Sequence, residues 1–193
     1  MPFAIALDQT YTYGDYRDWP EDERWELIDG VPYAMTAPKR IHQEIVTALA
    51  AQLYNHFKGT DCSPYVAPFD VRLPEADEQD ADTKTTVQPD LSVICDQDKL
   101  DELGCRGAPD WVIEVLSPST SLRDMNTKRD LYERHGVREY WLVHPTERWI
   151  MIYVLNDNKR YGKGQLFGMD QETASIIFSA LKVDWSFMPV ENA

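Results

Sequence analysis

One carboxylate in this sequence lies in the middle of an apolar segment. Glu114 belongs to the run Trp111–Leu116, in which side chains alternate between two faces if the run is a β-strand. Glu114 then shares its face with Val112 and Leu116. Burying a lone carboxylate is costly unless a cation or a metal ion pairs with it. We interpret Glu114 as a functional acid; the alternative is a strand end open to water, or a structural ion pair.

A second acid, Asp90, lies in the apolar run Val87–Cys95. Strand alternation places Asp90 on the same face as Gln88 and Ser92. A strand that carries an inward acid next to the strand of Glu114 would bring two carboxylates together. The alternative is an aspartate that only closes the turn after Pro89, which is a common use of aspartate.

Lys128 is the third candidate. It falls on the inward flank of the helix expected after the strand of Glu114, together with Leu131 and Tyr132. Because the strand leads directly into this helix, a lysine one or two turns along can reach the carboxylate of Glu114. The alternative is a lysine that extends its ammonium group to water.

Two carboxylates and a lysine together favour metal-dependent phosphodiester hydrolysis. Carboxylate oxygens bind Mg²⁺, which takes one or two carboxylates plus water and substrate phosphate, and Mn²⁺ is expected to substitute for it. The ion lowers the pKa of bound water and neutralises charge on the phosphate. A lysine ammonium can orient or deprotonate the attacking water and stabilise developing negative charge.

The elements that would position these residues are a mixture of helices and strands. Pro20 followed by acids predicts a short first helix that contains Glu26 and ends at Asp29-Gly30. Apolar residues near every fourth position predict a helix over Arg40–Phe57. A capping box of Ser121 and Asp124 predicts the start of a helix that ends at Gly136. Strands are predicted over Val31–Met35, Tyr65–Leu73, Val87–Cys95, Trp111–Leu116, Glu139–Val143, Trp149–Leu155, Gln165–Phe167 and Ala174–Phe178. The fold class is therefore α/β with a mixed sheet flanked by helices.

Length and composition favour one domain, residues 1–193, with 43% hydrophobic residues to form a core. The opening Met-Pro-Phe-Ala-Ile-Ala-Leu-Asp lacks the basic region of a signal peptide, so we expect a soluble, cytoplasmic protein. An odd number of cysteines argues against a disulfide framework. The cysteines and histidines show no zinc-ligand spacing; they are Cys62, Cys95, Cys105, His42, His56, His135 and His144.

The net charge of −14 opposes a nucleic-acid partner, because phosphate backbones attract basic surfaces. The charge is uneven, however. The stretch Glu75–Asp82 holds five acids and no base, whereas Ser121–Tyr140 holds five bases against four acids. Arg123 and Arg129 in the latter segment are candidate phosphate contacts, with solvated helix charges as the alternative.

Five motifs in order resemble the Uma-type endonuclease family, a branch of the PD-(D/E)XK superfamily. The resemblance runs from about Tyr13 to Val154. The motifs are Glu26-Leu-Ile-Asp-Gly30, Val87-Gln-Pro-Asp-Leu91, Glu114-Val-Leu-Ser-Pro-Ser-Thr120, Lys128-Arg-Asp-Leu-Tyr132 and Gly136-Val-Arg-Glu-Tyr-Trp-Leu-Val143. It implies a restriction-endonuclease-like fold, dependence on Mg²⁺ and cleavage of DNA.

The resemblance also assigns roles to individual residues. It places the metal-binding acids at Asp90 and Glu114, with Glu26 as an additional acid, although an exposed helix carboxylate is the alternative for Glu26. The usual lysine two places after the glutamate is absent, because Leu116 stands there. Lys128 would supply the ammonium group instead, as in other branches in which this lysine has moved.

Two other functions remain open on the sequence. The first is a catalytically silent binding or assembly module that keeps the fold, which the negative charge supports. The second is a nuclease for short or structured nucleic acid, which needs no long basic groove. A homodimer is plausible for a nuclease that cuts both strands of a duplex.

Overall fold

The computed structural model describes residues 9–20 and 23–188, and its centre is a six-stranded mixed sheet. In this central sheet β9 and β10 are parallel and the other neighbours are antiparallel. Its order is β12 (Gln165–Gly168), β11 (Trp149–Val154), β10 (Glu139–His144), β9 (Trp111–Val115), β6 (Leu91–Ile94) and β3 (Ser63–Val66).

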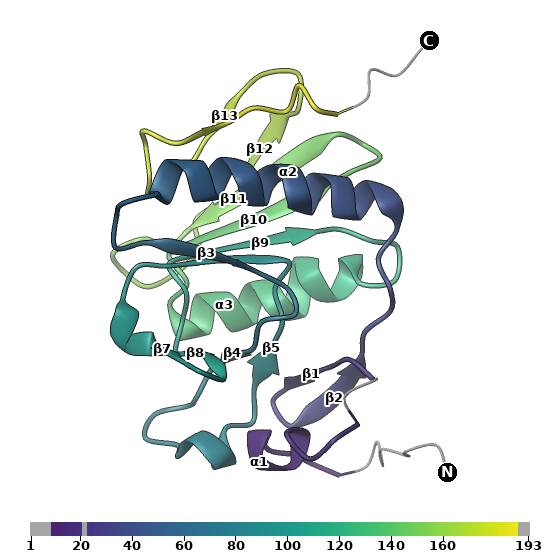
Figure 1. Cartoon of the computed structure of the whole chain (residues 1–193), viewed down its shortest axis with the longest axis vertical. Helices are drawn as coiled ribbons and strands as arrows, with labels where there is room; N and C mark the ends of the chain where they lie inside the picture. Colours follow the sequence, from purple (N-terminus) through teal and green to yellow (C-terminus); the bar gives the residue numbers. More distant parts are fainter. Residues whose placement is uncertain (1–8, 21–22, 189–193) are drawn as a thin grey trace.

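A second sheet of shorter strands lies beside one end of the central sheet (Figure 1). Its order is β2 (Val31–Ala34), β1 (Trp25–Ile28), β5 (Thr86–Val87), β4 (Val71–Arg72), β8 (Gly104–Arg106) and β7 (Leu100–Asp101). A two-stranded sheet of β13 (Thr173–Ala174) and β14 (Lys182–Val183) completes the β-structure of the described residues.

Helices cover both faces of the central sheet. The helices are α1 (Tyr13–Tyr16), α2 (Arg40–Phe57) and α3 (Arg129–His135), with 3₁₀ turns η1 (Asp80–Asp82) and η2 (Gln97–Lys99) and a π-helical segment η3 (Arg123–Lys128). Helix α2 packs on one face and α3 on the other (Figure 1). None of the helices in the described ranges is long and apolar enough to cross a bilayer.

Two hydrophobic cores result from this layering. One lies between α2 and the central sheet, where Leu49 and Leu53 pack with Trp111 and Trp141. The other lies between the opposite face, α3 and the second sheet, where Tyr132 packs with neighbours such as Leu142. Residues of the second sheet belong to the second core, so both sheets and α3 share one interior.

Long periodic segments form as the sequence predicts. Helix α2 has the predicted bounds Arg40–Phe57, and its apolar stripe faces the core. Strands β2, β9, β10, β11 and β12 lie within one residue of their predicted ranges. The predicted α/β class with a mixed sheet is confirmed, although the strands divide into two large sheets.

The predicted first helix is wrong. Residues 25–28, including Glu26, form strand β1, and Asp29-Gly30 is the hairpin turn to β2, with φ values of 51° and 79°. Two positive φ angles are what a two-residue hairpin of this kind requires, and Asp-Gly is a favoured pair for it. The predicted helix start at Glu21 and Asp22 lies outside the described residues, as does the opening segment 1–8.

Two predicted strands are each divided between the two sheets. The run 65–73 contains β3 and β4, and the run 87–95 contains β5 and β6. Residues 88–90 therefore connect one sheet to the other, and Asp90 lies in this connection. Of the run predicted at 174–178, only Ala174 is in a strand, and β7 and β8 occupy a segment predicted to be irregular.

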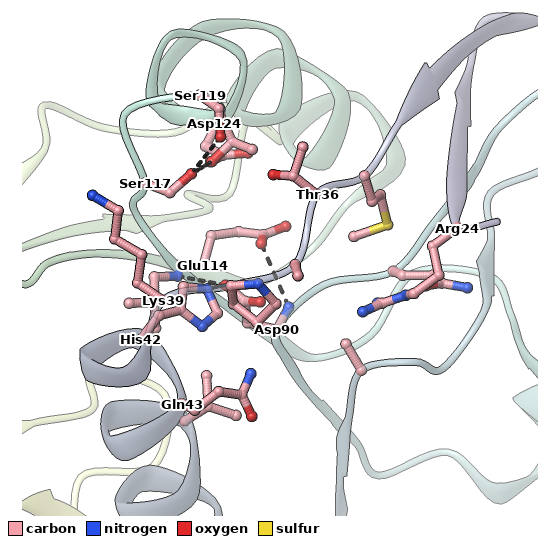
Figure 2. A pocket seen from close by; sticks show the side chains of 18 of the residues that line it. Arg24, Thr36, Lys39, His42, Gln43, Asp90, Glu114, Ser117, Ser119 and Asp124 are labelled. Atoms are coloured by element: carbon pink, nitrogen blue, oxygen red, sulfur yellow. Dashed lines mark hydrogen bonds and ion pairs between the residues drawn. The ribbon is translucent and has the colours of Figure 1, made fainter. Parts of the chain in front are cut away.

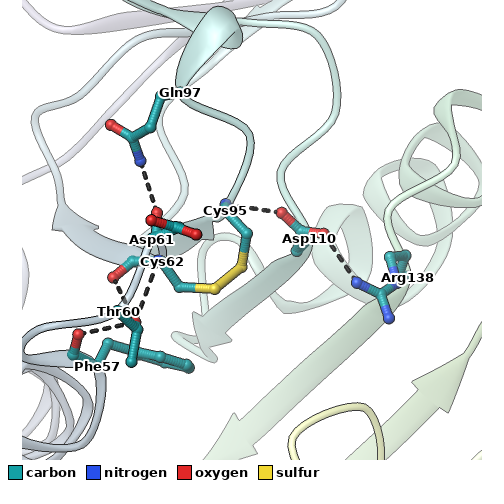
Figure 3. Close-up of a disulfide and its surroundings, with 8 residues drawn as sticks. All are labelled: Phe57, Thr60, Asp61, Cys62, Cys95, Gln97, Asp110 and Arg138. Atoms are coloured by element: carbon teal, nitrogen blue, oxygen red, sulfur yellow. Dashed lines mark hydrogen bonds and ion pairs between the residues drawn. A yellow bond between two sulfur atoms is a disulfide. The ribbon is translucent and has the colours of Figure 1, made fainter.

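The structure contains one disulfide bond, which the expectation of no disulfide framework did not anticipate. Cys62 and Cys95 are bonded (Figure 3). Cys105 is free and buried. The antiparallel pairing of β3 with β6 sets Ser63 opposite Ile94. The residues one step further, Cys62 and Cys95, are therefore neighbours across the two strands.

Candidate active site

A buried lysine forms the centre of the site. The Nζ atom of Lys128 lies 2.7 Å from Oε1 of Glu26, 2.8 Å from Oε1 of Glu114 and 3.7 Å from Oδ1 of Asp124. All four side chains are 5% exposed or less. One cation thus faces three carboxylates out of contact with bulk water.

Asp90 and Glu114 come together through strand pairing. Leu91 of β6 is opposite Ile113 of β9, so the next residue pair in this antiparallel register is Asp90 and Glu114. The Asp90 backbone N–H points toward Oε2 of Glu114 at 3.4 Å, and the Val115 N–H donates to Oδ2 of Asp90 at 2.8 Å. The sheet therefore aligns both acids, and both line one cavity.

Lys128 reaches the acids from the helix that follows β9. Segment η3 is a π-helical turn, and Asp124 and Lys128, four residues apart, are both buried on its inward side. The Tyr140 hydroxyl donates to the Asp124 carbonyl at 3.0 Å, which ties this turn to β10. The predicted capping box of Ser121 and Asp124 is wrong, because the Asp124 carboxylate is buried beside Lys128 instead.

Glu26 joins the site from strand β1. Its Oε1 accepts hydrogen bonds from Lys128 and from the Gln88 backbone N–H at 3.0 Å. Glu26 is buried in this strand position, so the alternative of an exposed helix carboxylate is wrong. Its contacts are those of a partner for Lys128.

Burial and like charges govern the protonation of the cluster. Burial, together with the nearby carboxylates of Asp124 and Asp90, raises the pKa of Glu114 well above its usual value, against the opposing effect of Lys128. Burial alone would lower the pKa of Lys128, but Glu114 and Glu26 outweigh it and raise that pKa. Lys128 is therefore a protonated hydrogen-bond donor with a surplus of negative charge around it.

The acids open onto a cavity of about 630 Å³, within the range of small-molecule and cofactor sites. Figure 2 shows Asp90 and Glu114 at its centre, with His42 of α2 on one side and Arg24 on the other. The acidic stretch Glu75–Asp82 is not among the lining residues. Part of its charge is neutralised elsewhere, because Glu75 contacts Arg134 and Asp80 contacts Arg72.

The sequence interpretation missed His42. Its Nε2 lies 3.0 Å from Oδ2 of Asp90, while its Nδ1 is buried and has no hydrogen-bond partner among the described residues. A signal for it exists, because His42 precedes the buried Ile45 and Val46 by three and four residues in the α2 helix. Metal-ligand spacing was the wrong criterion for a histidine that contacts an acid from another element.

The two arginines proposed as phosphate contacts have different positions. Arg123 lines the cavity, with its guanidinium carbon 4.8 Å from the centre of the Tyr33 ring. Arg129 does not line the cavity, and its Nε donates to Oδ1 of Asp130 at 3.0 Å. The structure therefore brings only Arg123 to the acids.

The donor set is compatible with a divalent cation. Asp90 and Glu114 offer carboxylate oxygens at the cavity, and burial followed by the neighbouring carboxylates raises the pKa of Glu114. In the described ranges no three His, Cys, Asp or Glu side chains converge on one metal position. Two carboxylates suit Mg²⁺, which completes its shell with water and substrate phosphate.

Comparisons with known proteins agree on the fold. The model of the Uma2 family, described as "Putative restriction endonuclease", matches residues 13–190. An uncharacterized protein of Synechocystis sp. is 33% identical over 147 residues, 75% of this chain and 74% of that protein. A solved structure from Anabaena variabilis, described as a "putative nuclease", superposes with a TM-score of 0.72 at 20% identity, covering 92% of this chain and 96% of that one. The last match establishes the fold alone, which is the one that the sequence predicted.

Proposed function

Because the chain belongs to the Uma2 family, we propose that it is a Mg²⁺-dependent endonuclease that hydrolyses phosphodiester bonds in DNA. One observation carries the proposal: a buried, protonated lysine bonded to Glu114 and Glu26 beside Asp90, at a cavity of sufficient size. An ammonium group and paired acids are the groups that such hydrolysis needs.

Asp90 and Glu114 would hold the divalent ion, Mg²⁺ or Mn²⁺. When bound, the ion would activate water and neutralise phosphate charge. The His42 side chain and the Val115 N–H both contact Oδ2 of Asp90 and so fix the orientation of that carboxylate. The contacts of Glu26 support a different role from the metal ligand expected, that of holding Lys128.

Lys128 would stabilise the negative charge that develops on the phosphoryl oxygens. Its raised pKa keeps it charged, so it donates hydrogen bonds and is not a base in this state. The attacking water loses a proton to solvent and forms the new bond to phosphorus as the bond to the leaving sugar oxygen breaks, and that oxygen takes a proton from solvent. Glu26 and Asp124 hold the ammonium group at this position in advance, which lowers the cost of ordering it.

Three further features belong to the proposal. A DNA substrate would place the protein in the cytoplasm. Residues 1–193 would act as one domain, supported by the interior that both sheets share with α3. A homodimer would supply two sites, each of which would act on one strand.

The test is cleavage of DNA at low salt, where the few basic contacts are least screened. Wild-type protein with Mg²⁺ or Mn²⁺ should nick or cut, and EDTA should stop the reaction. Asp90→Asn should reduce the rate by at least about a hundredfold, because it removes a ligand charge. Asp101→Asn is the matched control, since Asp101 is absent from the cavity lining and should leave cleavage unchanged. Equal activity in both variants would assign the cleavage to a contaminant.

The second candidate is a silent binding module, favoured by the net charge of −14. It predicts no divalent-ion binding and no cleavage of single-stranded, double-stranded or structured DNA and RNA. Thermal denaturation with and without Mn²⁺ separates the two functions, because an ion that binds only the folded state raises Tm.

A further inference from the structure

Basic side chains line the same cavity as the acids. Arg24, Lys39 and Arg123 face it, and in Figure 2 Arg24 and Lys39 lie on opposite sides of Asp90. In a chain with 33 acids and 19 bases, arginines are expected to be neutralised by carboxylates. Most are: ion pairs are formed by Arg40, Arg72, Arg106, Arg129, Arg134, Arg138 and Arg160.

Arg24 is held by a neutral partner instead. Its Nε and Nη2 donate to Oε1 of Gln88 at 3.2 and 2.8 Å. The Gln88 amide is itself fixed, because its Nε2 donates to Oδ1 of Asp70 at 2.9 Å and to the Tyr16 hydroxyl at 3.1 Å. Gln88 therefore orients the guanidinium group without cancelling its charge, and Nη1 makes no hydrogen bond with the described residues.

Arg123 is also held by a neutral partner, the face of the Tyr33 ring. Its Nε is buried and has no hydrogen-bond partner within the described ranges, and no carboxylate there lies within ion-pair distance. Stacking on an aromatic ring leaves the N–H groups at the edge of a guanidinium available. Both cavity arginines thus combine a fixed position with the absence of an ion pair to any described carboxylate.

We propose that Arg24 and Arg123 form an anion subsite for the phosphate groups of one nucleic-acid strand that enters the cavity. The inference rests on the proposed nuclease function and names its substrate class, single-stranded nucleic acid. Guanidinium groups suit phosphate oxygens because they donate two parallel hydrogen bonds. Besides Lys128, the cavity of this acidic protein offers three basic side chains, a number that suits one phosphate backbone better than the two of a duplex.

Binding can be measured separately from cleavage. A fluorescein-labelled single-stranded 12-mer is titrated with protein at low salt in EDTA, which prevents hydrolysis, and anisotropy gives Kd. Arg24→Gln and Arg123→Gln should each raise Kd about five- to tenfold and reduce the slope of log Kd against log salt by about 0.7, the value for one phosphate contact on a single strand. Arg129→Gln is the matched control and should change neither quantity, because Asp130 already neutralises Arg129.

Arg24→Lys is a control for misfolding caused by the loss of the hydrogen bonds between Arg24 and Gln88. It retains the charge, so it should bind more tightly than Arg24→Gln, with thermal denaturation confirming that both are folded. Wild-type affinity in the folded glutamine variants would overturn the subsite, as would a wild-type protein that binds no strand. A duplex of the same sequence that binds equally well, with the same losses, would overturn the preference for single strands. Strand binding with these losses but no cleavage in Mg²⁺ would retain the subsite and refute the nuclease.

Discussion

Arg72 and Lys128 are both buried among carboxylates, but the exposure of those carboxylates differs between the two clusters. Arg72 donates to Asp80 at 2.8 Å and to Asp101 at 2.6 Å, and those side chains are 34% and 48% exposed. The acids around Lys128 are all buried, and Asp90 lies nearby. The two clusters therefore differ in how much water reaches their acids.

That difference separates a structural cluster from a candidate site. Hydrogen bonds and charge from Arg72 lower the pKa of Asp101 despite its partial burial, so this acid stays ionised at little cost. Burial and neighbouring acids raise the pKa of Glu114, so ionising that acid costs free energy. A further cation bound at the cavity would favour the ionised form of Glu114, whereas Asp101 is already ionised beside Arg72.

The largest effect is expected from Glu114→Gln. Cleavage with Mg²⁺ should fall on the order of a thousandfold, because the substitution keeps the shape but removes a charge that would hold the ion. Thermal stability should be equal or higher, since a buried charge with a raised pKa is lost. Glu139→Gln is the control: Glu139 is also a buried strand glutamate, but it accepts from the Ile176 and Ile177 N–H groups, away from the cavity. A similar loss of cleavage in both variants would mean that Glu114 acts as a structural buried glutamate like Glu139, and not as a metal ligand.

Arg72→Met should produce the opposite pattern. Breaking a buried ion cluster by removing the cation is expected to lower the free energy of unfolding by about 3 kcal/mol. The rate of DNA cleavage by the folded protein should not change, because Arg72 is absent from the cavity lining. Urea unfolding and a cleavage assay at 10 °C on the same sample measure the two quantities. A folded Arg72→Met protein without activity would show that the clusters are functionally coupled.

Lys128→Met should reduce the cleavage rate about a hundredfold, since it removes one donor to the transition state. Divalent-ion binding should persist, because Asp90 and Glu114 remain. Isothermal titration with Mn²⁺ gives the affinity, and single-turnover cleavage gives the rate. Equal losses of ion affinity and rate would mean that Lys128 serves to organise the acids and takes no part in the chemical step.

The smallest effect concerns the pH dependence of stability. The lowered pKa of Asp101 contributes stability above its unfolded value of 3.8, which is lost as the pH falls through the lower folded value. The raised pKa of Glu114 acts in the other direction: above its unfolded value of 4.5 the unfolded chain binds fewer protons than the folded one, so stability declines as pH rises. Urea unfolding across pH should show Asp101→Asn flattening the acid limb and Glu114→Gln flattening the decline. If the free energy of unfolding keeps its wild-type dependence on pH in both variants, Asp101 and Glu114 are not the groups responsible for it.

Local patterns determined much of the fold and the chemical character of the site. The α2 helix follows from a repeat near every fourth residue, which buries one face, and β9 follows from a run that is apolar except for Glu114 and is buried on both faces. An acid in the middle of β9 had to be buried with a cation, and the inward flank of the next helix supplied Lys128. These inferences need only the neighbours of each residue along the chain.

Only the tertiary structure decided which distant residues join that core. Glu26 reaches Lys128 because Trp25–Ile28 pairs in a hairpin, and His42 reaches Asp90 because α2 begins beside the connection at residues 88–90. The Cys62–Cys95 bond likewise depends on the register of β3 with β6. Strand pairing and packing bring together residues far apart in the chain, and their free energy outweighs local propensity. The periodicity of a single segment carries no information about those partners.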